Sequence, residues 1–298
     1  MNITSEVKEQ ILPKEEESRA EKTAFLFALV KCLGSVGISG GKTFLELESK
    51  HNLPVITAVG LIKELTDISV EYGSGGGKSY YVRINGEDVG KVLSLFGEGG
   101  LFSTFGSTDG IKSRLQAQAY ARGAFLASGS AYIPSEDGGG YHAEFLFFGE
   151  EAAKEFQKLL HRCALNVQVA EKGSYFGVYA KSENAVSDIL AFMGASDSVM
   201  QIADVSAMRE MNNSINRATN CTIANIDKSQ ATVIRQLEAI ERLKASGEYE
   251  KLDDKLKETC VAREQYKDFT LEQLAAKMGI SKSGLNHRLA KITSLGEK

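Results

Sequence analysis

The fold of this chain follows from two related stretches of sequence, AFLFALVKCLGS at residues 24–35 and YARGAFLASGS at residues 120–130. Each is an apolar run of helical character that ends at a Gly-Ser pair, and the two pairs lie 95 residues apart. Because similarity at a fixed spacing indicates an internal repeat, we predict two repeats, at about 24–96 and 120–195. They would pair as a pseudo-dimer with the two opening helices at the seam. Small residues there would let the backbones approach closely: Ala28, Gly34, Gly123, Ala124 and Ala127.

The segments after each Gly-Ser pair follow one order of strands and helices. Alternating apolar residues predict strands, and apolar residues at spacings of three and four predict helices. The first repeat is expected to contain two strands at 36–38 and 43–47, a helix at 54–65, a hairpin at 68–84 and a final helix at 87–96. The second repeat is expected to contain the same elements: two strands at 130–133 and 141–148, a helix at 150–161, a hairpin with arms at 166–169 and 175–180, and a final helix at 183–193. The predicted fold class is α+β, a duplicated αββαββα domain followed by helices.

The composition is that of an ordinary globular protein. Of the 298 residues, 43% are hydrophobic and 25% are charged, which excludes global disorder and a coiled-coil rod. The longest apolar run, residues 24–30, is too short to span a bilayer, and no signal peptide opens the sequence. The four cysteines form no CxxC pair, so we expect neither disulfides nor a zinc site. These features indicate a cytoplasmic protein with no cofactor and no membrane partner.

The change in composition along the chain predicts four segments. Residues 1–22 are charge-rich and predict a short exposed helix, and residues 23–195 hold the duplicated domain. Residues 196–258 are expected to form consecutive helices of a connector, with a polar break at 245–250. Residues 259–298 are expected to form a small all-helical domain.

The strongest local signal is FTLEQLAAKMGISKSGLNHRLAKI at residues 269–292. Thr270, with Gln273 three residues later, predicts a capping box that starts one helix. Gly279 permits the positive φ of a tight turn, and Ser281 is expected to cap a second helix. That helix is expected to bury three apolar residues: Leu285, Leu289 and Ile292. The pattern is typical of a helix-turn-helix, which places its second helix in the major groove of DNA.

The polar side of that second helix carries the residues that we expect to contact DNA. Residues 281–292 include three cations and no carboxylate. Side chains opposite the apolar stripe or beside it suit base contacts: Ser283, Asn286 and His287. The cations suit phosphate contacts: Lys282, Arg288 and Lys291. Ser281, which is expected to cap the helix, completes the set of expected DNA-binding residues. The alternative is an ordinary helical hairpin with a solvated polar face; the turn glycine, the small Ala275 and the acid-free helix together favour DNA binding.

The net charge of −4 is an average over unlike parts of the chain. Residues 266–298 hold six Lys or Arg and three Asp or Glu, a net charge of +3, so the rest of the chain carries −7. The acidic total excludes a protein that coats nucleic acid indiscriminately, and it is compatible with a weakly basic domain that binds DNA selectively.

An asparagine-rich stretch, MREMNNSINRATNCTIANIDK at residues 208–228, is unusual for a helical region because asparagine is a poor helix former. Its amides and cations form a second candidate set: Arg209, Asn212, Asn213, Asn216, Arg217, Asn220, Asn225 and Lys228. These side chains either cap helix ends and hold the connector to its neighbours, or contact phosphates or bases of DNA. Amides and cations serve both purposes, so both interpretations stay open.

No catalytic or metal site emerges from the sequence. GISGGKT at 37–43 and GSGGGKS at 73–79 resemble the end of a P-loop, but both lack its first glycine and lie between strands, so we interpret them as hairpin turns. His142 and Glu144 form an HxE pair without the PCxxC of a zinc deaminase. No GxSxG occurs, and Cys32 is expected to be a core residue.

The order of these parts resembles the WhiA family of bacterial regulators. The resemblance is most specific in RGAFLASGS (122–130), MREMNNSINRATNCTIANIDKSQATVIRQLEAI (208–240) and ISKSGLNHRLAKI (280–292). It implies an N-terminal domain with the fold of LAGLIDADG homing endonucleases. In active nucleases of that fold, an acidic residue just before the helix-ending glycine holds the catalytic metal. This chain has Leu33 and Ser128 there, and because neither supplies an anionic ligand for Mg²⁺, we expect no nuclease activity.

The resemblance further implies a sequence-specific, nucleoid-associated transcriptional regulator that acts in cell division, chromosome segregation and sporulation. Its implied partners are double-stranded DNA and other transcription or division proteins. Because the sheets show no dense cationic stripe, we favour protein interaction over DNA binding for the duplicated domain. One chain supplies both halves of the seam, so we expect a monomer. Two alternatives stay open: a structural division or nucleoid factor that works through protein contacts, and an active metal-dependent endonuclease.

Overall fold

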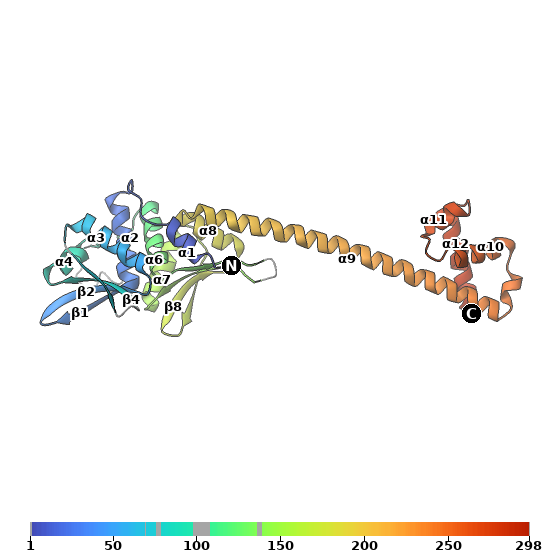
Figure 1. Cartoon of the computed structure of the whole chain (residues 1–298), viewed down its shortest axis with the longest axis horizontal. Coiled ribbons are helices and arrows are strands. Elements are labelled where there is room, and N and C mark those ends of the chain that lie inside the picture. The colour runs from blue at the N-terminus through green and yellow to red at the C-terminus, as the bar shows by residue number, and fades with distance from the viewer. Residues whose placement is uncertain (1, 69, 76–78, 98–107, 136–138, 298) are drawn as a thin grey trace. The chain divides into compact units, whose positions relative to one another are not determined.

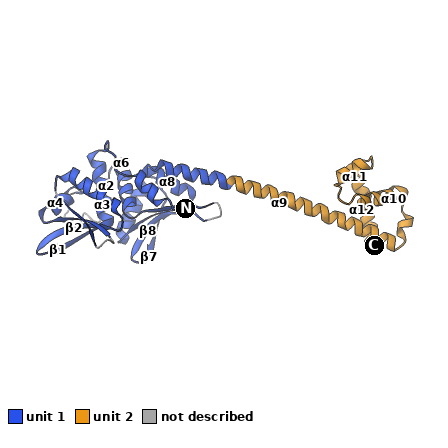
Figure 2. Cartoon of the chain, in the orientation of Figure 1, with its two compact units in different colours: residues 1–209 blue, residues 210–298 orange. Residues whose placement is uncertain are grey.

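The computed structural model describes five stretches of the chain, residues 2–68, 70–75, 79–97, 108–135 and 139–297. The chain packs as two compact units, residues 1–209 and residues 210–298 (Figure 2). The helix α9, Ser196–Ala245, belongs in part to each unit. None of the helices in the described stretches is long and apolar enough to cross a membrane.

Unit 1 contains two repeats with one topology (Figure 1). The first comprises α2 (Arg19–Leu33), β1 (Gly34–Ser39), β2 (Lys42–Ser49), α3 (Asn52–Thr66), β3 (Glu71–Gly75), β4 (Ser79–Asn85) and α4 (Glu87–Ser94). The second comprises α6 (Arg114–Ser128), β5 (Ser130–Tyr132), β6 (His142–Phe147), α7 (Glu150–Arg162), β7 (Gln168–Lys172), β8 (Tyr175–Ala180) and α8 (Glu183–Met193). The two antiparallel sheets have corresponding strand orders, β1-β2-β4-β3 and β5-β6-β8-β7.

The strand register repeats as well. Ser35, which follows the helix-ending glycine of α2, pairs with Glu46, and Ser130, which follows that of α6, pairs with Glu144. The two glutamates therefore occupy equivalent positions on the second strand of each sheet. The predicted duplication is confirmed.

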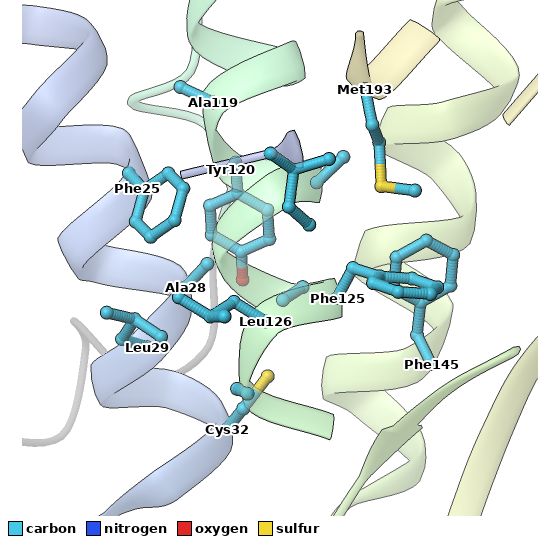
Figure 3. Close-up of a cluster of buried hydrophobic side chains, with 14 of the residues drawn as sticks. Phe25, Ala28, Leu29, Cys32, Ala119, Tyr120, Phe125, Leu126, Phe145 and Met193 are labelled. Carbon is cyan, nitrogen blue, oxygen red and sulfur yellow. The ribbon is translucent and has the colours of Figure 1, made fainter. Parts of the chain in front are cut away.

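The helices α2 and α6 form the predicted seam between the repeats. Residues 24–32 of α2 are all buried, as expected for a helix with apolar residues on every side. A Cβ added at Gly123 would lie 2.4 Å from the carbonyl oxygen of Phe25 and 3.0 Å from the Cβ of Ala28. The two backbones therefore touch where the small residues lie. Figure 3 shows the buried cluster at this contact, with Phe25 and Ala28 on α2 and Tyr120 on α6.

The expectation of one exposed polar helix over residues 1–22 is wrong. The structure has a short helix α1, Thr4–Gln10, and α2 already begins at Arg19. Ile3, Val7 and Ile11 are fully buried, because a spacing of four residues places them on one face of the helical turns. The high charge of the segment conceals this apolar stripe. The segment is anchored on the second repeat, where the Ile3 amide donates to the carbonyl of Ala131 at 3.2 Å.

The first glycine-rich stretch is a hairpin turn, as predicted. Gly40 and Gly41 join β1 to β2 with φ values of 57° and 73°, a left-handed conformation that favours glycine. The second stretch joins β3 to β4, and its residues 76–78 lie outside the described residues.

Unit 2 is helical. The connector expected as consecutive helices is one helix, α9, up to Ala245, and the predicted polar break follows it as a turn and a 3-10 segment, Glu248–Lys251. The remaining helices are α10 (Asp254–Gln265), α11 (Leu271–Lys277) and α12 (Lys282–Gly296). The C-terminal turns of α9 contribute Ile240 and Leu243 to the core of this unit. The compact helical part therefore extends further toward the N-terminus than residue 259.

The seam contact predicts an unusual response to substitution of a helical glycine. Gly123→Ala should lower the free energy of unfolding by about 1–3 kcal/mol, because its Cβ would overlap the Phe25 carbonyl. Gly60→Ala in α3 is the matched control, since its Cβ would meet no atom within 4 Å and alanine favours the helix by up to about 1 kcal/mol. Urea unfolding followed by circular dichroism measures both. A Gly123→Ala protein as stable as Gly60→Ala would contradict the seam.

A buried ion pair predicts acid sensitivity. Arg122 donates to both carboxylate oxygens of Glu17, at 2.6 and 2.9 Å. Burial raises the pKa of Glu17, but the hydrogen bonds from Arg122 and the Lys14 amide outweigh it, so this pKa lies below its ordinary value of 4.5. The charged pair thus stabilises the fold above pH 4.5, and its contribution is lost as the pH falls through the lowered pKa.

We expect Glu17→Gln to lower the free energy of unfolding by about 2 kcal/mol at pH 7. The difference from wild type should shrink as the pH is lowered below 4.5. The control is Glu16→Gln, since Glu16 is exposed. Urea unfolding at a series of pH values tests this, and a difference that stays constant down to pH 3 would contradict it.

Candidate nucleic-acid interface

The helices α11 and α12 form the predicted helix-turn-helix. Thr270 Oγ1 accepts from the Gln273 amide at 3.3 Å, and Gln273 Oε1 accepts from the Thr270 amide at 2.9 Å, which completes the capping box. Gly279 takes a φ of 67° in the turn. Ser281 Oγ accepts from the Gly284 amide at 3.1 Å and so caps α12. Each of these local predictions is confirmed.

The inner face of α12 is held by the core of unit 2. The three predicted apolar residues are fully buried: Leu285, Leu289 and Ile292. At its C-terminal end, a Cβ at Gly296 would lie 2.5 Å from the carbonyl oxygen of Ala239 in α9. The helix is therefore fixed against α9 with its polar side toward solvent.

Arg263 of α10 also orients this motif, and sequence reasoning missed it. The side chain is almost completely buried, and Nη2 donates to the carbonyl oxygens of Tyr266, Lys267 and Phe269 at 3.0, 3.4 and 2.7 Å. These carbonyls form the turn from α10 into α11. An arginine two residues before the end of a helix is a weak signal, because such residues usually lie in solvent.

The polar side of α12 is accessible, as predicted. Six of the seven expected contact residues are exposed: Ser281, Lys282, Ser283, Asn286, His287 and Lys291. Arg288 is half-buried, and its guanidinium donates to the Lys255 carbonyl at 3.5 Å. Lys282 lies 3.6 Å from Glu272, and Lys291 lies 3.9 Å from Asp253. These pairs are long and solvated, so both ammonium groups can exchange them for phosphates at little cost.

The structure places the asparagine-rich residues within α9, so none of them caps a helix end. Arg209 donates to the Gly139 carbonyl at 3.3 Å, and Asn225 contacts Cys221 on its own helix. Across the described residues, no hydrogen bond or ion pair involves the side chains of the other members: Asn212, Asn213, Asn216, Arg217, Asn220 and Lys228. Each asparagine weakens the helix by about 0.6 kcal/mol relative to alanine. The interpretation that this set holds the connector to its neighbours therefore applies to Arg209 alone.

Only part of this set shares a face. At about 100° per residue, Asn213, Asn216, Arg217 and Asn220 lie on one side of α9. Lys228 lies at the edge of that side, and Asn225 lies about 130° around the helix from its centre. Asn212 is half-buried, beside an exposed apolar row that includes Met211, Ile215 and Ile226. We call the four residues on one side the amide stripe.

The positions just before the helix-ending glycines carry no acidic group. Leu33 is the last residue of α2, and Ser128 is the last residue of α6. Ser128 Oγ accepts from the Leu146 amide at 3.2 Å and donates to the Ala124 carbonyl at 3.3 Å, so it joins its helix to β6. Burial raises the pKa of the neighbouring Cys32 to about 12, which keeps it a thiol. Among the described residues, no group of three His, Cys, Asp or Glu could hold a metal ion.

Comparisons with known proteins match both units. Residues 117–212 match the WhiA LAGLIDADG-like domain, and residues 215–296 match the WhiA C-terminal HTH domain. The probable cell division protein WhiA of Thermoanaerobacter pseudethanolicus is 32% identical over 317 residues, covering 100% of this chain and 98% of the relative. The chain belongs to the WhiA family.

Other WhiA proteins agree with this assignment. The probable cell division protein WhiA of Oceanobacillus iheyensis is 32% identical, over 100% of this chain and 98% of its own. The crystal structure of full-length WhiA from Thermotoga maritima aligns with a TM-score of 0.61 at 22% identity, and the alignment covers 98% of this chain and 96% of that one. This likeness supports the fold.

The role of Arg263 can be tested by a conservative change. Arg263→Lys should lower the stability of unit 2 by about 1–3 kcal/mol, because the lysine side chain is one bond shorter and its ammonium group would not reach the three carbonyls that Nη2 contacts. Arg242→Lys on the solvent side of α9 is the control and should change stability by less than about 0.5 kcal/mol. Hydrogen exchange of the α11 amides reports the local effect. Unchanged exchange in Arg263→Lys would show that the turn does not depend on this arginine.

Proposed function

We propose that this WhiA family member is a sequence-specific DNA-binding transcriptional regulator without nuclease activity. The observation that carries the proposal is the accessible, acid-free polar side of α12 on a capped helix-turn-helix. A helix presented in this way fits the major groove, where side chains reach the edges of bases.

The chemistry of the exposed residues divides their roles. Asn286 can pair with an adenine through its amide, and Ser283 and His287 can exchange hydrogen bonds with neighbouring bases. Lys282, Arg288 and Lys291 supply charge to phosphates, which fixes the register of the helix in the groove. The first turn of α12 contains no acidic residue, so the positive end of the helix dipole adds to this attraction.

We assign the duplicated domain to protein interaction. On its two sheets, Arg83 is paired with Glu46 at 2.6 Å and Lys172 with Glu144 at 2.7 Å. These pairs neutralise cations that a DNA surface would leave free for phosphates. Because Leu33 and Ser128 provide no carboxylate for a metal, we also propose that this domain does not cleave DNA.

The biological setting is inferred from relatives. The WhiA proteins of Thermoanaerobacter pseudethanolicus and Oceanobacillus iheyensis bear the name probable cell division protein. We propose that this chain acts as a cytoplasmic, nucleoid-associated monomer that regulates genes of cell division, chromosome segregation and sporulation. The rival is a structural division factor that works through protein contacts.

Selection of bound duplexes from a random DNA pool tests the proposal. We expect an enriched motif with the wild-type chain, and Asn286→Ala should relax selection at one position, with a loss of about 1–3 kcal/mol. Arg288→Ala with Lys291→Ala should weaken binding to all sequences and reduce the salt dependence. Lys154→Ala with Lys158→Ala, exposed on α7, is the charge-matched control. Absence of any enriched motif would favour the structural factor.

Supercoiled plasmid incubated with Mg²⁺ tests the absence of nuclease activity. The plasmid should stay supercoiled, because no carboxylate precedes either helix-ending glycine. Nicking that EDTA abolishes and that persists through further purification would contradict the proposal.

A further inference from the structure

We infer that the amide stripe of α9, formed by Asn213, Asn216, Arg217 and Asn220, is a second surface for double-stranded DNA. The inference rests on the proposed function of unit 2 as a DNA reader and deepens it. It adds a base-reading or phosphate-binding face on a helix other than α12. All four residues lie in unit 2.

The geometry of the stripe suits a groove of DNA. Residues spaced by three and four lie in a row on one side of an α-helix, and the side chains of all four are exposed. From Asn213 to Asn220 the row is about 10 Å long, at 1.5 Å per residue. That length matches about three base pairs. A helix bearing short polar side chains in such a row can approach base edges as closely as α12.

The asparagines of the stripe are unfavourable in a helix, and no hydrogen bond within the described residues offsets this cost. Asn213, Asn216 and Asn220 weaken a helix, and in the described residues their amides have no partner. Exposed helix positions are ordinarily filled by strong helix formers, so unfavourable choices without a local gain indicate a functional surface. An external polar partner would provide the missing hydrogen bonds.

Charge and chemistry favour DNA as that partner. Residues 211–226 contain no acidic residue, in a chain whose net charge is −4. Arg217 lies within the stripe, and Lys228 lies about 12 Å beyond Asn220 along α9. Both side chains can reach phosphates. A side-chain amide offers both a donor and an acceptor, which matches adenine in the major groove. An apolar partner would instead choose the row of Met211, Ile215 and Ile226 on another side of the helix.

The test compares two triple variants of the full chain on the selected DNA. The stripe variant is Asn213→Ala/Asn216→Ala/Asn220→Ala, which leaves every charge in place. The matched control is Ser214→Ala/Asn225→Ala/Thr232→Ala, on a side of α9 that lies about 110–130° around the helix from the stripe. Alanine favours helix, so both variants should keep or gain helicity and thermal stability. Two duplexes are used: one is trimmed to the selected motif, and the other carries the motif with flanks longer than about ten base pairs. Flanks of this length are needed because Asn220 lies about 30 Å along α9 from Ile240, which belongs to the core that holds α12.

We expect the stripe variant to bind the flanked duplex at least about tenfold more weakly than wild type and to lose protection of one flank in a hydroxyl-radical footprint. On the trimmed duplex it should equal wild type, and the control should equal wild type on both. The base pairs of the motif that α12 contacts should still be selected from a random pool, because α12 is untouched.

Three results would overturn the inference. If the stripe variant binds flanked DNA as tightly as wild type, DNA is not the partner of the stripe. If the stripe variant loses a self-association that wild type shows in sedimentation, the partner is a second copy of the chain. An equal loss in the control would assign the effect to the helix as a whole. The proposed function fails by a separate result, in which the wild-type chain itself selects no motif.

Discussion

The backbone contact between α2 and α6 is the constraint on which unit 1 depends. At Gly123 the two helices approach so closely that a single methyl group would overlap the Phe25 carbonyl. Each helix ends at a glycine that leads directly into the first strand of its sheet, so the seam fixes both sheets. Because both sides of the seam belong to one chain, the pseudo-dimer needs no second copy.

Features encoded by near neighbours were predictable from the sequence. The glycines at 34 and 129 indicated the duplication, and the caps at Thr270 and Ser281 located both helices of the motif. These signals are local because a cap bonds to an amide within three residues. Features that need distant partners were not predictable. The Arg122–Glu17 pair spans 105 residues, and the burial of Ile3, Val7 and Ile11 depends on their packing against the second repeat.

The candidate DNA-binding site also combines features set by near neighbours in the sequence with features that depend on distant residues. The exposed side of α12 follows from the helical period, but the support from Arg263 depends on a turn that only the tertiary structure brings to its guanidinium. For the asparagine-rich segment, the sequence left capping and DNA contact equally open. Because all of these asparagines lie within one continuous helix, none of them caps a helix end. The two proposed DNA surfaces then lie on α9 and α12 of one unit, while Arg83 and Lys172 on the sheets of the other unit pair with glutamates.

We propose that unit 2 binds DNA and that the sheets of unit 1 do not. Hydrogen exchange of the full chain, with and without a selected duplex, tests it most directly. We expect DNA to slow exchange in α12 and around residues 213–220 of α9, and to leave exchange in β1 to β8 unchanged. Slower exchange confined to the strands, with α12 unaffected, would contradict it.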